Sequence, residues 1–568
     1  MPKPNKLMLA RSTMCRTGVD RGHVEKLNIK ARTQKQTRRM KVLFSCGNAP
    51  GLASGYGAQA LTVLKALLNG GHEVAVLAWN FSLAAHATSA EEVEQPTHKF
   101  MEGAPPVRSL VKEELKLPWH KVTWVCNPYA TYPSPIHKRD INRILTAVGA
   151  DLIVVFQDIF MWQPGHFVVP SVVWMPLHFT PVEHPTVLAL SDFDVQVGIS
   201  AWGAEQLRLL SEPRMHGGGP LGRCIRTIPH GRDATVFRPW TEEEDPAAKR
   251  IAVRKRLGWP LDAFVALIVA SNSEESGRKA LDAQLQGWAR FAQARDSKKS
   301  MQRPVYVHLH TEIARAYDVG RILEVVGEFP ERGRHINFRD NRARTQAPVD
   351  GSPLQGPRFG FSAAQTISNT PTEALVDMYR AADVLLAATC SEGCGVPILE
   401  AQLCGTPVIT TAATAMTEET VFGIAVPPAQ WIARMDFNSG WMLPCAHGIS
   451  QALAAIESWG PEDIASRRLV ALPIVRAAYD ESAIKDAWRA LVSEIFEATK
   501  QEAGLDLPPE RWLFLKAARK SAVLGRLIGQ LERRAKSHST CIGGAKERLQ
   551  FLEGARSELA KFGGLRQR

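Results

Sequence analysis

The sequence predicts an α/β protein made of two parallel-sheet domains, and three observations carry this prediction. The chain has 568 residues, which is more than one hydrophobic core usually serves. Short apolar and β-branched runs alternate with helical segments along most of the chain, as in repeated strand–helix–strand units. An acidic stretch that contains a proline, residues 240–246, separates an earlier set of these units from a later one.

The first domain is expected over residues 40–240. Its elements are predicted as a helix at 58–68 and strands at 41–45, 72–77, 152–156, 172–175 and 195–199. The loop between the first strand and the helix is rich in glycine and contains Gly55, Tyr56 and Gly57. Because glycine has no side chain, this loop would let the backbone approach a phosphate or an acceptor, and Tyr56 would line that site or simply pack.

The second domain is expected over residues 241–476. Its elements are predicted as helices at 280–294 and 396–403 and strands at 265–269, 305–309, 336–339, 384–387 and 408–410. Residues 341–372 are rich in glycine, proline, glutamine and arginine, and they are expected to form an inserted loop. Since the carboxyl ends of parallel strands meet at one edge of a sheet, we expect the ligand there, in the crevice between the domains.

The composition is that of a soluble globular protein, with 45% hydrophobic and 22% charged residues. No apolar run approaches the ~18 residues that a membrane helix needs. The start of the chain also lacks the apolar core of a signal peptide. The nine cysteines are scattered without a Cys-x-x-Cys pair, which favours reduced thiols over a disulfide framework or a zinc site. We therefore expect a cytoplasmic protein.

The positive charge of the chain lies at its two ends. Of the net charge of +12, residues 1–39 contribute +9 and residues 501–568 contribute +7, which leaves −4 for the body between them. Residues 1–39 are expected to be a disordered basic tail, unless Met40 is the true start of the protein. Residues 511–534 have the spacing of a basic amphipathic helix, which would contact DNA, an anionic membrane or its own domain.

The most informative motif places two glutamates, Glu392 and Glu400, eight positions apart. A loop with two glycines and a proline lies between them and leads into the helix predicted at 396–403. A glycine loop that opens a helix offers unpaired N–H groups and the positive end of the helix dipole, which together suit a diphosphate. Carboxylates accept hydrogen bonds from the hydroxyls of sugars and ribose. The motif therefore predicts a site for a hydroxyl-rich ligand that carries a diphosphate.

Residues 391–401 resemble the E-x7-E motif of retaining glycosyltransferases of the GT-B fold, especially glycosyltransferase family 4. The similarity extends upstream over residues 375–386, and the strand–loop–helix–strand unit that begins at 41 resembles the first unit of the same family. Residues 227–239 resemble the family's passage into the hinge, except that Arg232 intervenes and places Asp233 one position late.

The resemblance implies a GT-B fold, in which two Rossmann-like domains face each other across a cleft. It also implies that residues 477–500, with a helix predicted at 479–497, cross back to the first domain. Residues 501–568 would follow as a basic helical extension. The pocket for the nucleotide base would lie near residues 336–341, where the chain departs from the small residues common in the family.

The resemblance further implies how a nucleotide-sugar donor would be held. Glu400 would bind the ribose hydroxyls, and Glu392 would hold the donor sugar and stabilise positive charge near its anomeric carbon. The leaving diphosphate would be neutralised by two cations and by N–H groups at the helix start. These residues are Arg278, Lys279, Cys394, Gly395 and Val396.

Two further positions follow from the same resemblance. His178, just past a predicted strand, would face the sugar and the leaving oxygen. Ala280 stands where the family usually has glycine. Asp192 and Asp194 have the Asp-x-Asp form of metal-dependent glycosyltransferases of a different fold, but they directly precede a strand of the first domain and are interpreted as a polar strand entry.

The implied activity is a metal-independent, retaining transfer of a sugar from a nucleotide-sugar to an acceptor, without a cofactor. The acceptor is unidentified, and a small molecule, a glycan or a lipid-linked molecule is preferred. One alternative is transfer to a modified DNA base, as in a branch common in bacterial and phage genomes, with the basic ends holding the duplex. Another alternative is a non-catalytic protein that binds a nucleotide-sugar.

Overall fold

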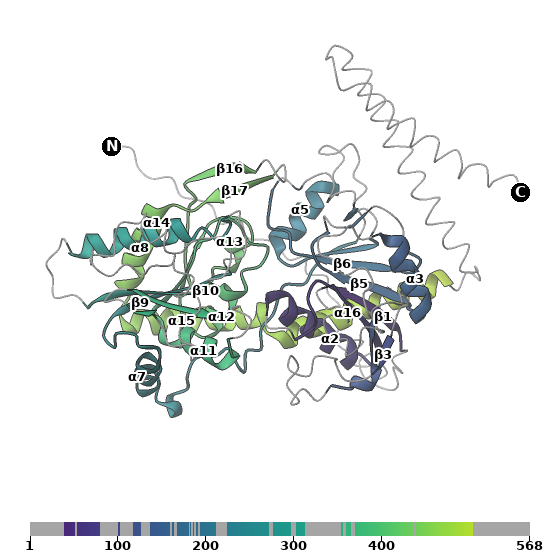
Figure 1. Cartoon of the computed structure of the whole chain (residues 1–568), viewed down its shortest axis with the longest axis horizontal. Coiled ribbons are helices and arrows are strands. Elements are labelled where there is room, and N and C mark those ends of the chain that lie inside the picture. Colours follow the sequence, from purple (N-terminus) through teal and green to yellow (C-terminus); the bar gives the residue numbers. More distant parts are fainter. Residues whose placement is uncertain are drawn as a thin grey trace, which may run out of the picture. The chain divides into compact units, whose positions relative to one another are not determined.

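The computed structural model describes residues 39–503 with several breaks (Figure 1). The breaks are 52–53, 80–99, 103–116, 126–136, 160–161, 164–166, 181, 183–185, 187–188, 191–192, 212–223, 272–276, 297–302, 313–353, 356–358, 365–369 and 435–438. The remaining residues form two mostly parallel sheets with helices on both faces, as predicted. The basic ends, and the strand and base pocket expected at 336–341, lie outside the described residues.

The first sheet has the strand order β3-β4-β2-β1-β5-β6-β7-β8. Its strands are β1 (Lys41–Cys46), β2 (Glu73–Ala78), β3 (Phe100–Glu102), β4 (Val122–Val125), β5 (Leu152–Phe156), β6 (Ser171–Met175), β7 (Val195–Gly198) and β8 (Ile225–Thr227). Neighbouring strands run parallel except β3 and β4. The five strands predicted from the sequence agree within one residue at each end, because buried runs of apolar residues mark them locally.

Helices cover both faces of the first sheet. On one face, α2 (Gly55–Asn69) and α16 (Glu481–Ala503) share a core cluster with β1 and β5, to which Ile484 and Trp488 contribute from α16. On the other face, α3 (Lys138–Val148) and α5 (Ala201–Ser211) pack against a second cluster. The helix predicted to begin at residue 479 in fact begins at Glu481, because extended backbone at Asp480 separates it from the preceding helix.

The second sheet has the strand order β11-β12-β10-β9-β13-β14-β15. Its strands are β9 (Phe264–Val269), β10 (Val305–Glu312), β11 (Leu354–Gln355), β12 (Phe359–Ala364), β13 (Val384–Ala387), β14 (Val408–Thr411) and β15 (Gly423–Val426). The loop predicted over 341–372 is wrong in part, because β12 pairs in parallel with β10. Glycines and prolines around it hid a strand whose partner lies about fifty residues away along the chain.

The second sheet is also covered on both faces. The helices α8 (Leu281–Asp296) and α14 (Ala446–Glu457) pack side by side on one face (Figure 1). The opposite face carries α7 (Pro246–Leu257), α11 (Thr372–Ala381), α12 (Val396–Leu403) and α15 (Pro461–Tyr479), and α13 (Met416–Glu419) follows β14. A separate hairpin pairs β16 (Gln430–Arg434) with β17 (Ser439–Leu443). Short 3-10 helices occur at Trp119–Lys121 and Glu242–Glu244.

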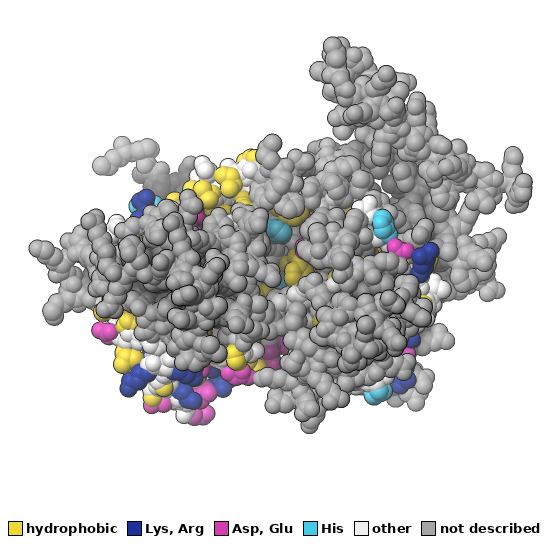
Figure 2. Space-filling view, in the orientation of Figure 1, with side chains coloured by type: hydrophobic (Ala, Val, Ile, Leu, Met, Phe, Trp, Pro, Cys, Tyr) yellow, Lys and Arg dark blue, Asp and Glu magenta, His cyan; other side chains and the backbone are white. Residues whose placement is uncertain are grey.

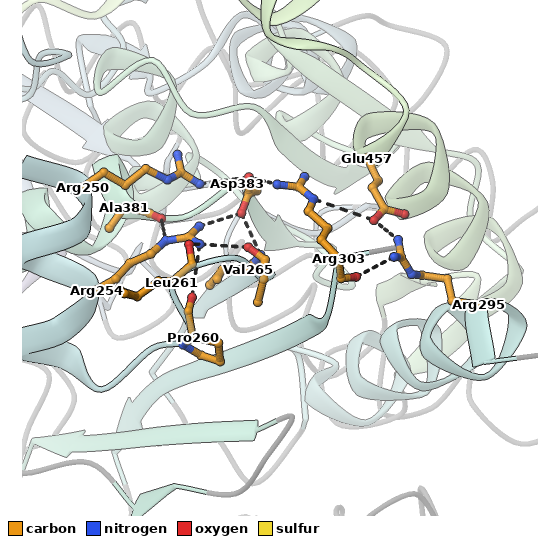
Figure 3. Close-up of polar contacts among 11 residues, drawn as sticks. Arg250, Arg254, Pro260, Leu261, Val265, Arg295, Arg303, Ala381, Asp383 and Glu457 are labelled. Atoms are coloured by element: carbon orange, nitrogen blue, oxygen red, sulfur yellow. Dashed lines mark hydrogen bonds and ion pairs between the residues drawn. The ribbon is translucent and has the colours of Figure 1, made fainter. Parts of the chain in front are cut away.

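A buried ion network ties together the amino-terminal edge of the second sheet (Figure 3). Asp383 precedes β13, and its carboxylate pairs with Arg250 at 2.9 Å, Arg254 at 2.8 Å and Arg303 at 3.2 Å. The Asp383 Oδ2 atom also accepts a hydrogen bond from the N–H of Val265 in β9 at 2.8 Å. This network therefore joins α7 and two central strands at the edge opposite to the strand carboxyl ends.

No helix within the described ranges is both long and apolar enough to cross a membrane.

Candidate functional site

Of the two glutamates predicted from the sequence, Glu392 meets the predicted cations at the carboxyl edge of the second sheet, whereas Glu400 pairs with other residues. The turn after β9 carries Arg278 and Lys279, the loop after β13 carries Glu392, and the loop after β14 carries Thr414. Because β9, β13 and β14 are parallel neighbours, their following loops emerge at the same edge. The fold thus brings together residues that are more than one hundred positions apart in the sequence.

Glu392 lies at the centre of this group and is 7% exposed. Its Oε2 atom accepts a hydrogen bond from Arg278 at 2.8 Å, and its Oε1 atom accepts one from Lys279 at 2.6 Å. Its backbone N–H donates to the Thr414 hydroxyl at 3.1 Å. Burial alone would raise the pKa of Glu392, but the two cations outweigh it, and the pKa is lowered. Two cations against one carboxylate leave a net positive site that suits an anion.

Strained backbone marks the same place. Three non-glycine residues in the described ranges have a positive φ, and two of them, Ala280 (45°) and Thr414 (50°), flank Glu392 and its cations. The third, Asp245, caps α7. A side chain in this conformation costs on the order of 1 kcal/mol or more, and a β-branched residue is a genuine outlier there. Strain of this kind gathers at ligand sites, which adds a signal independent of the charges.

Glu400 lies in α12 and is 2% exposed. The Tyr379 hydroxyl of α11 donates to its Oε2 atom at 2.7 Å, and Arg232 forms an ion pair with its Oε1 atom. In the sequence, Arg232 stands out only because it interrupts the family pattern, and Tyr379 was given no role. Arg232 is 168 residues before Glu400 in the sequence, so no local pattern predicts this ion pair.

The start of α12 is capped by an internal carboxylate, which the sequence did not predict. The N–H of Gly395 donates to Oε2 of Glu419 at 3.0 Å, and the N–H of Val396 donates to the carbonyl of Cys394 at 3.1 Å. Two of the N–H groups expected to bind a diphosphate are therefore engaged within the protein. Burial raises the pKa of Glu419 to about 7, and burial with the neighbouring Glu419 raises the pKa of the Cys394 thiol.

Several buried polar atoms around α12 make no hydrogen bond with the described residues. They are Oε1 of Glu400, Nε of Arg232, Oε1 of Glu419 and both ring nitrogens of His230. His230 is 6% exposed and packs edge-on against Phe156 and Trp174, and burial lowers its pKa to about 3, so the ring is neutral. Because buried unsatisfied groups are rare, their concentration here indicates a place where a polar ligand binds.

The predicted residue His178 lies beside the Glu392 loop. The Ser391 hydroxyl donates to the backbone carbonyl of His178, and the His178 ring nitrogen Nδ1 lies 3.2 Å from the carbonyl of Pro176. A Cβ atom on Gly393 would fall 2.5 Å from the Leu177 carbonyl oxygen, so only glycine fits there. The loop after β6 in the first sheet therefore touches the loop after β13 in the second.

The predicted loop Gly55–Gly57 is the first turn of α2 rather than a loop before the helix. Ser54 caps the helix and accepts a hydrogen bond from the N–H of Gly57 at 3.0 Å, so α2 begins three residues earlier than predicted. The Tyr56 hydroxyl donates to Asp158 at 2.9 Å, and the Tyr56 ring packs on Phe156. This turn follows β1 and therefore lies at the carboxyl edge of the first sheet.

The β16–β17 hairpin is a part of the site that the sequence did not reveal. The N–H of Gly440 donates to the carbonyl of Thr180 at 3.2 Å, and the N–H of Met442 donates to the carbonyl of Cys390 at 3.2 Å. The hairpin thus contacts the loops that carry His178 and Glu392. Hydrophobic side chains gather over it in Figure 2, and Trp431 is 50% exposed.

The Asp-x-Asp segment gives no metal cluster in the described part of the chain. Asp192 lies outside the described residues, whereas Oδ2 of Asp194 accepts hydrogen bonds from the N–H and the hydroxyl of Ser171 at 2.9 and 2.8 Å. These bonds tie the start of β7 to β6. The described residues also hold no group of three or more His, Cys, Asp or Glu side chains that could bind a metal ion.

The class defined by this architecture is the GT-B fold, with two doubly wound sheets and the candidate site at their carboxyl edges. Residues 361–436 match the family model "Glycosyl transferases group 1", and this segment holds Glu392, Glu400 and Glu419. A short segment of the chain is therefore similar to group 1 glycosyl transferases, and the chain as a whole has the GT-B fold. A sequence comparison with curated proteins gives no significant match.

Similar solved structures share the fold at low sequence identity. Sucrose-phosphate synthase from Thermosynechococcus elongatus has a TM-score of 0.51 and 15% identity, and the match covers 81% of this chain and 100% of that one. An α,α-trehalose 6-phosphate synthase from Burkholderia multivorans has a TM-score of 0.51 and 14% identity, with 83% and 99% covered. A UDP-forming α,α-trehalose-phosphate synthase from Burkholderia vietnamiensis has a TM-score of 0.51 and 13% identity, with 82% and 99% covered.

Proposed function

We propose that this protein is a glycosyltransferase that moves a sugar from a nucleoside-diphosphate sugar to an acceptor. The observation that carries the proposal is the group of Glu392, Arg278 and Lys279 beside the unsatisfied polar atoms around α12. Cations, carboxylates and unsatisfied buried atoms match the three parts of such a donor, which are a diphosphate, a sugar and a ribose. The GT-B fold and the matched segment support the same reaction.

The proposed chemistry assigns one task to each group. Lys279 and Arg278 would neutralise the charge that grows on the departing diphosphate, an electrostatic contribution worth several kcal/mol in the transition state. Glu392 would accept hydrogen bonds from the donor sugar and stabilise positive charge near the anomeric carbon. Because fixed cations fill the role that a metal ion plays elsewhere, we propose that the reaction needs no metal or cofactor. Retention of anomeric configuration is proposed from the E-x7-E spacing of Glu392 and Glu400.

The Glu392 ion pairs also indicate how the site stays stable without a ligand. Burying two cations without counter-charge would cost several kcal/mol, and the carboxylate offsets this cost. An incoming diphosphate would share Arg278 and Lys279 with Glu392, so the cations are never left unpaired. His178, whose backbone touches the Glu392 loop, is proposed to face the donor sugar.

The test is a thermal-shift and calorimetric screen of UDP, GDP, ADP and TDP and their glucose conjugates, followed by donor hydrolysis without an acceptor. A ligand at 100 times its Kd stabilises the protein by about 2.7 kcal/mol. UDP is the first probe, because one structurally similar protein bears the description UDP-forming. Binding and slow hydrolysis that survive EDTA are expected. Binding without hydrolysis or transfer would indicate a non-catalytic protein, and no binding at all would contradict the proposal.

A further inference from the structure

Glu400 lies in a buried environment in which it pairs with one arginine. The side chain is 2% exposed, and the hydroxyl of Tyr379 donates to its Oε2 atom. Among the described residues, Arg232 is the cation paired with Glu400, at Oε1. Breaking a buried ion pair by removing one partner is costly, so Arg232 holds this carboxylate in place.

The backbone on which Arg232 sits is held from several sides. Its N–H donates to the carbonyl of Tyr479 at 2.9 Å, and its carbonyl accepts from the N–H of Glu481 at 3.0 Å. The preceding Gly231 is bound on both sides by the Gln59 amide of α2, at 2.8 and 3.1 Å. The guanidinium itself lies 5.1 Å from the centre of the Phe237 ring. The side chain therefore reaches Glu400 from a fixed point in the segment that joins the two sheets.

Both members of the pair keep unused hydrogen-bonding capacity. Oε1 of Glu400 accepts no hydrogen bond from the described residues despite its ion pair, and Nε of Arg232 donates none to them. In contrast, Oε2 of Glu400 is fixed by Tyr379. Tyr379 and Arg232 thus hold the carboxylate from two directions, and the acceptor capacity that remains is on Oε1.

We propose that Arg232 is a positioning residue for the donor nucleotide, which pairs with Glu400 and keeps it turned so that Oε1 accepts a hydrogen bond from a ribose hydroxyl. This inference rests on the proposed function. It adds a residue outside the second sheet and its helices to the donor site. The donor pocket is therefore complete only when the connecting segment is docked against α12.

The experiment compares R232Q and R232K with the wild type by calorimetric titration of UDP, GDP, ADP and TDP at pH 7. R232Q removes the cation that holds Oε1 of Glu400 and leaves the buried carboxyl without its ion pair. We expect the Kd of R232Q to rise at least about tenfold relative to the wild type. R232K, which keeps the charge, should restore most of the affinity.

The comparison uses the ratio of the variant Kd to the wild-type Kd. A matched control is R238Q, since Arg238 lies in the same connecting segment and pairs with the partly exposed Glu244 at 2.6 Å. R238Q should leave the Kd unchanged. Denaturant unfolding checks that each variant is folded under the conditions of the titration.

The outcomes separate this inference from the proposed function. If the wild type binds the nucleotide and the ratio for R232Q stays near one, or R232K loses as much affinity as R232Q, Arg232 does not position Glu400. If the wild type binds none of the four nucleotides, the donor site itself is contradicted, and the role of Arg232 falls with it.

Discussion

Two carboxylates of the second half, Asp383 and Glu400, both pair with arginine but differ in how completely they are satisfied. Oδ2 of Asp383 accepts hydrogen bonds from Arg254 and from the N–H of Val265, and Oδ1 pairs with two further arginines. Arg254 in turn donates to four backbone carbonyls, those of Ala381, Pro260, Leu261 and Ala263. In the Glu400 pair, one carboxylate atom, Oε1, and one guanidinium atom, Nε of Arg232, make no hydrogen bond with the described residues, although Oε2 is bound by Tyr379.

This difference supports a division of roles, in which the Asp383 network holds the fold and the Glu400 group is proposed to bind a ligand. The Asp383 network lies at the amino-terminal edge of the sheet, where its bonds join strands and a helix (Figure 3). The Glu400 group lies at the carboxyl edge, where parallel-sheet proteins bind their ligands. A polar network in which every group has a hydrogen-bond partner stabilises the fold. A network with unpaired buried atoms gains stability when a ligand supplies the missing partners.

The largest expected effect follows from removing Asp383. D383A leaves three arginines without their shared carboxylate, and breaking a buried ion pair in this way costs about 3–5 kcal/mol. Denaturant unfolding should show this loss, while nucleotide affinity of the folded protein stays unchanged. A loss of unfolding free energy below about 1 kcal/mol is typical of a surface ion pair. Such a result would show that the Asp383 network does not hold the fold.

The second effect is a pH dependence that comes from Glu419. Its pKa is raised from 4.5 to about 7 by burial, so the folded state binds the proton more tightly than the unfolded state. The stability that this proton contributes is fully present below about pH 4.5 and is lost as the pH rises through about 7. A shift of this size corresponds to roughly 3 kcal/mol.

The measurement for Glu419 is the free energy of unfolding of the wild type minus that of E419Q across this pH range. The difference should fall as the pH rises. His230, His308 and His310 have pKa values lowered by burial, so they weaken the fold on acidification below about 6.5, and the subtraction cancels their effect. A flat difference would show that Glu419 stays ionised in the fold.

The third effect concerns turnover and Glu392. E392Q should lower donor turnover about a hundredfold or more, as expected when a charge that stabilises a transition state is removed. Nucleotide binding should not weaken, because Arg278 and Lys279 are released from the carboxylate and remain available to the diphosphate. Steady-state kinetics and calorimetry on the same preparation check the two parts. Equal losses in turnover and nucleotide affinity would contradict the separate roles.

The smallest expected effect is the loss of one phosphate contact. K279A should weaken nucleoside-diphosphate binding by about 2 kcal/mol, the size of a charge-assisted hydrogen bond to a partly buried anion. The matched control is K65A, because Lys65 in α2 pairs with Glu481 of α16 at 3.0 Å. Calorimetry should show weaker nucleotide binding for K279A but not for K65A. Similar Kd values for both variants would show that Lys279 does not bind the nucleotide.

The comparison of the two networks also explains what the sequence could predict. Most strands predicted within the described residues, and α12, agree with the structure within one residue at each end, because apolar runs, glycines and prolines act over a few residues. The spacing of Glu392 and Glu400 predicted the candidate site for the same reason. The strands β3, β4, β8, β11 and β15 were not predicted. Arg232, Tyr379 and Glu419 were missed, because each reaches α12 from another segment of the chain.

Other misses have a similar physical origin. The strand β12 is set by its pairing with β10, which no local pattern reveals among glycines and prolines. The break at Asp480 has no proline or glycine to mark it. The start of α16 was therefore predicted two residues too early, at 479. The β16–β17 hairpin contacts the site through backbone hydrogen bonds to Thr180 and Cys390. Such bonds do not depend on side-chain identity, so the sequence does not reveal them.

The central claim is that the unsatisfied group at Glu400 binds the donor nucleotide. Its most direct test is calorimetric titration of UDP, GDP, ADP and TDP into E400Q, with E244Q as a matched control, since Glu244 also pairs with an arginine. We predict that E400Q weakens binding of the preferred nucleotide at least about tenfold, as a lost acceptor for a ribose hydroxyl requires, and that E244Q leaves it unchanged. Equal affinity of E400Q and the wild type would contradict the account.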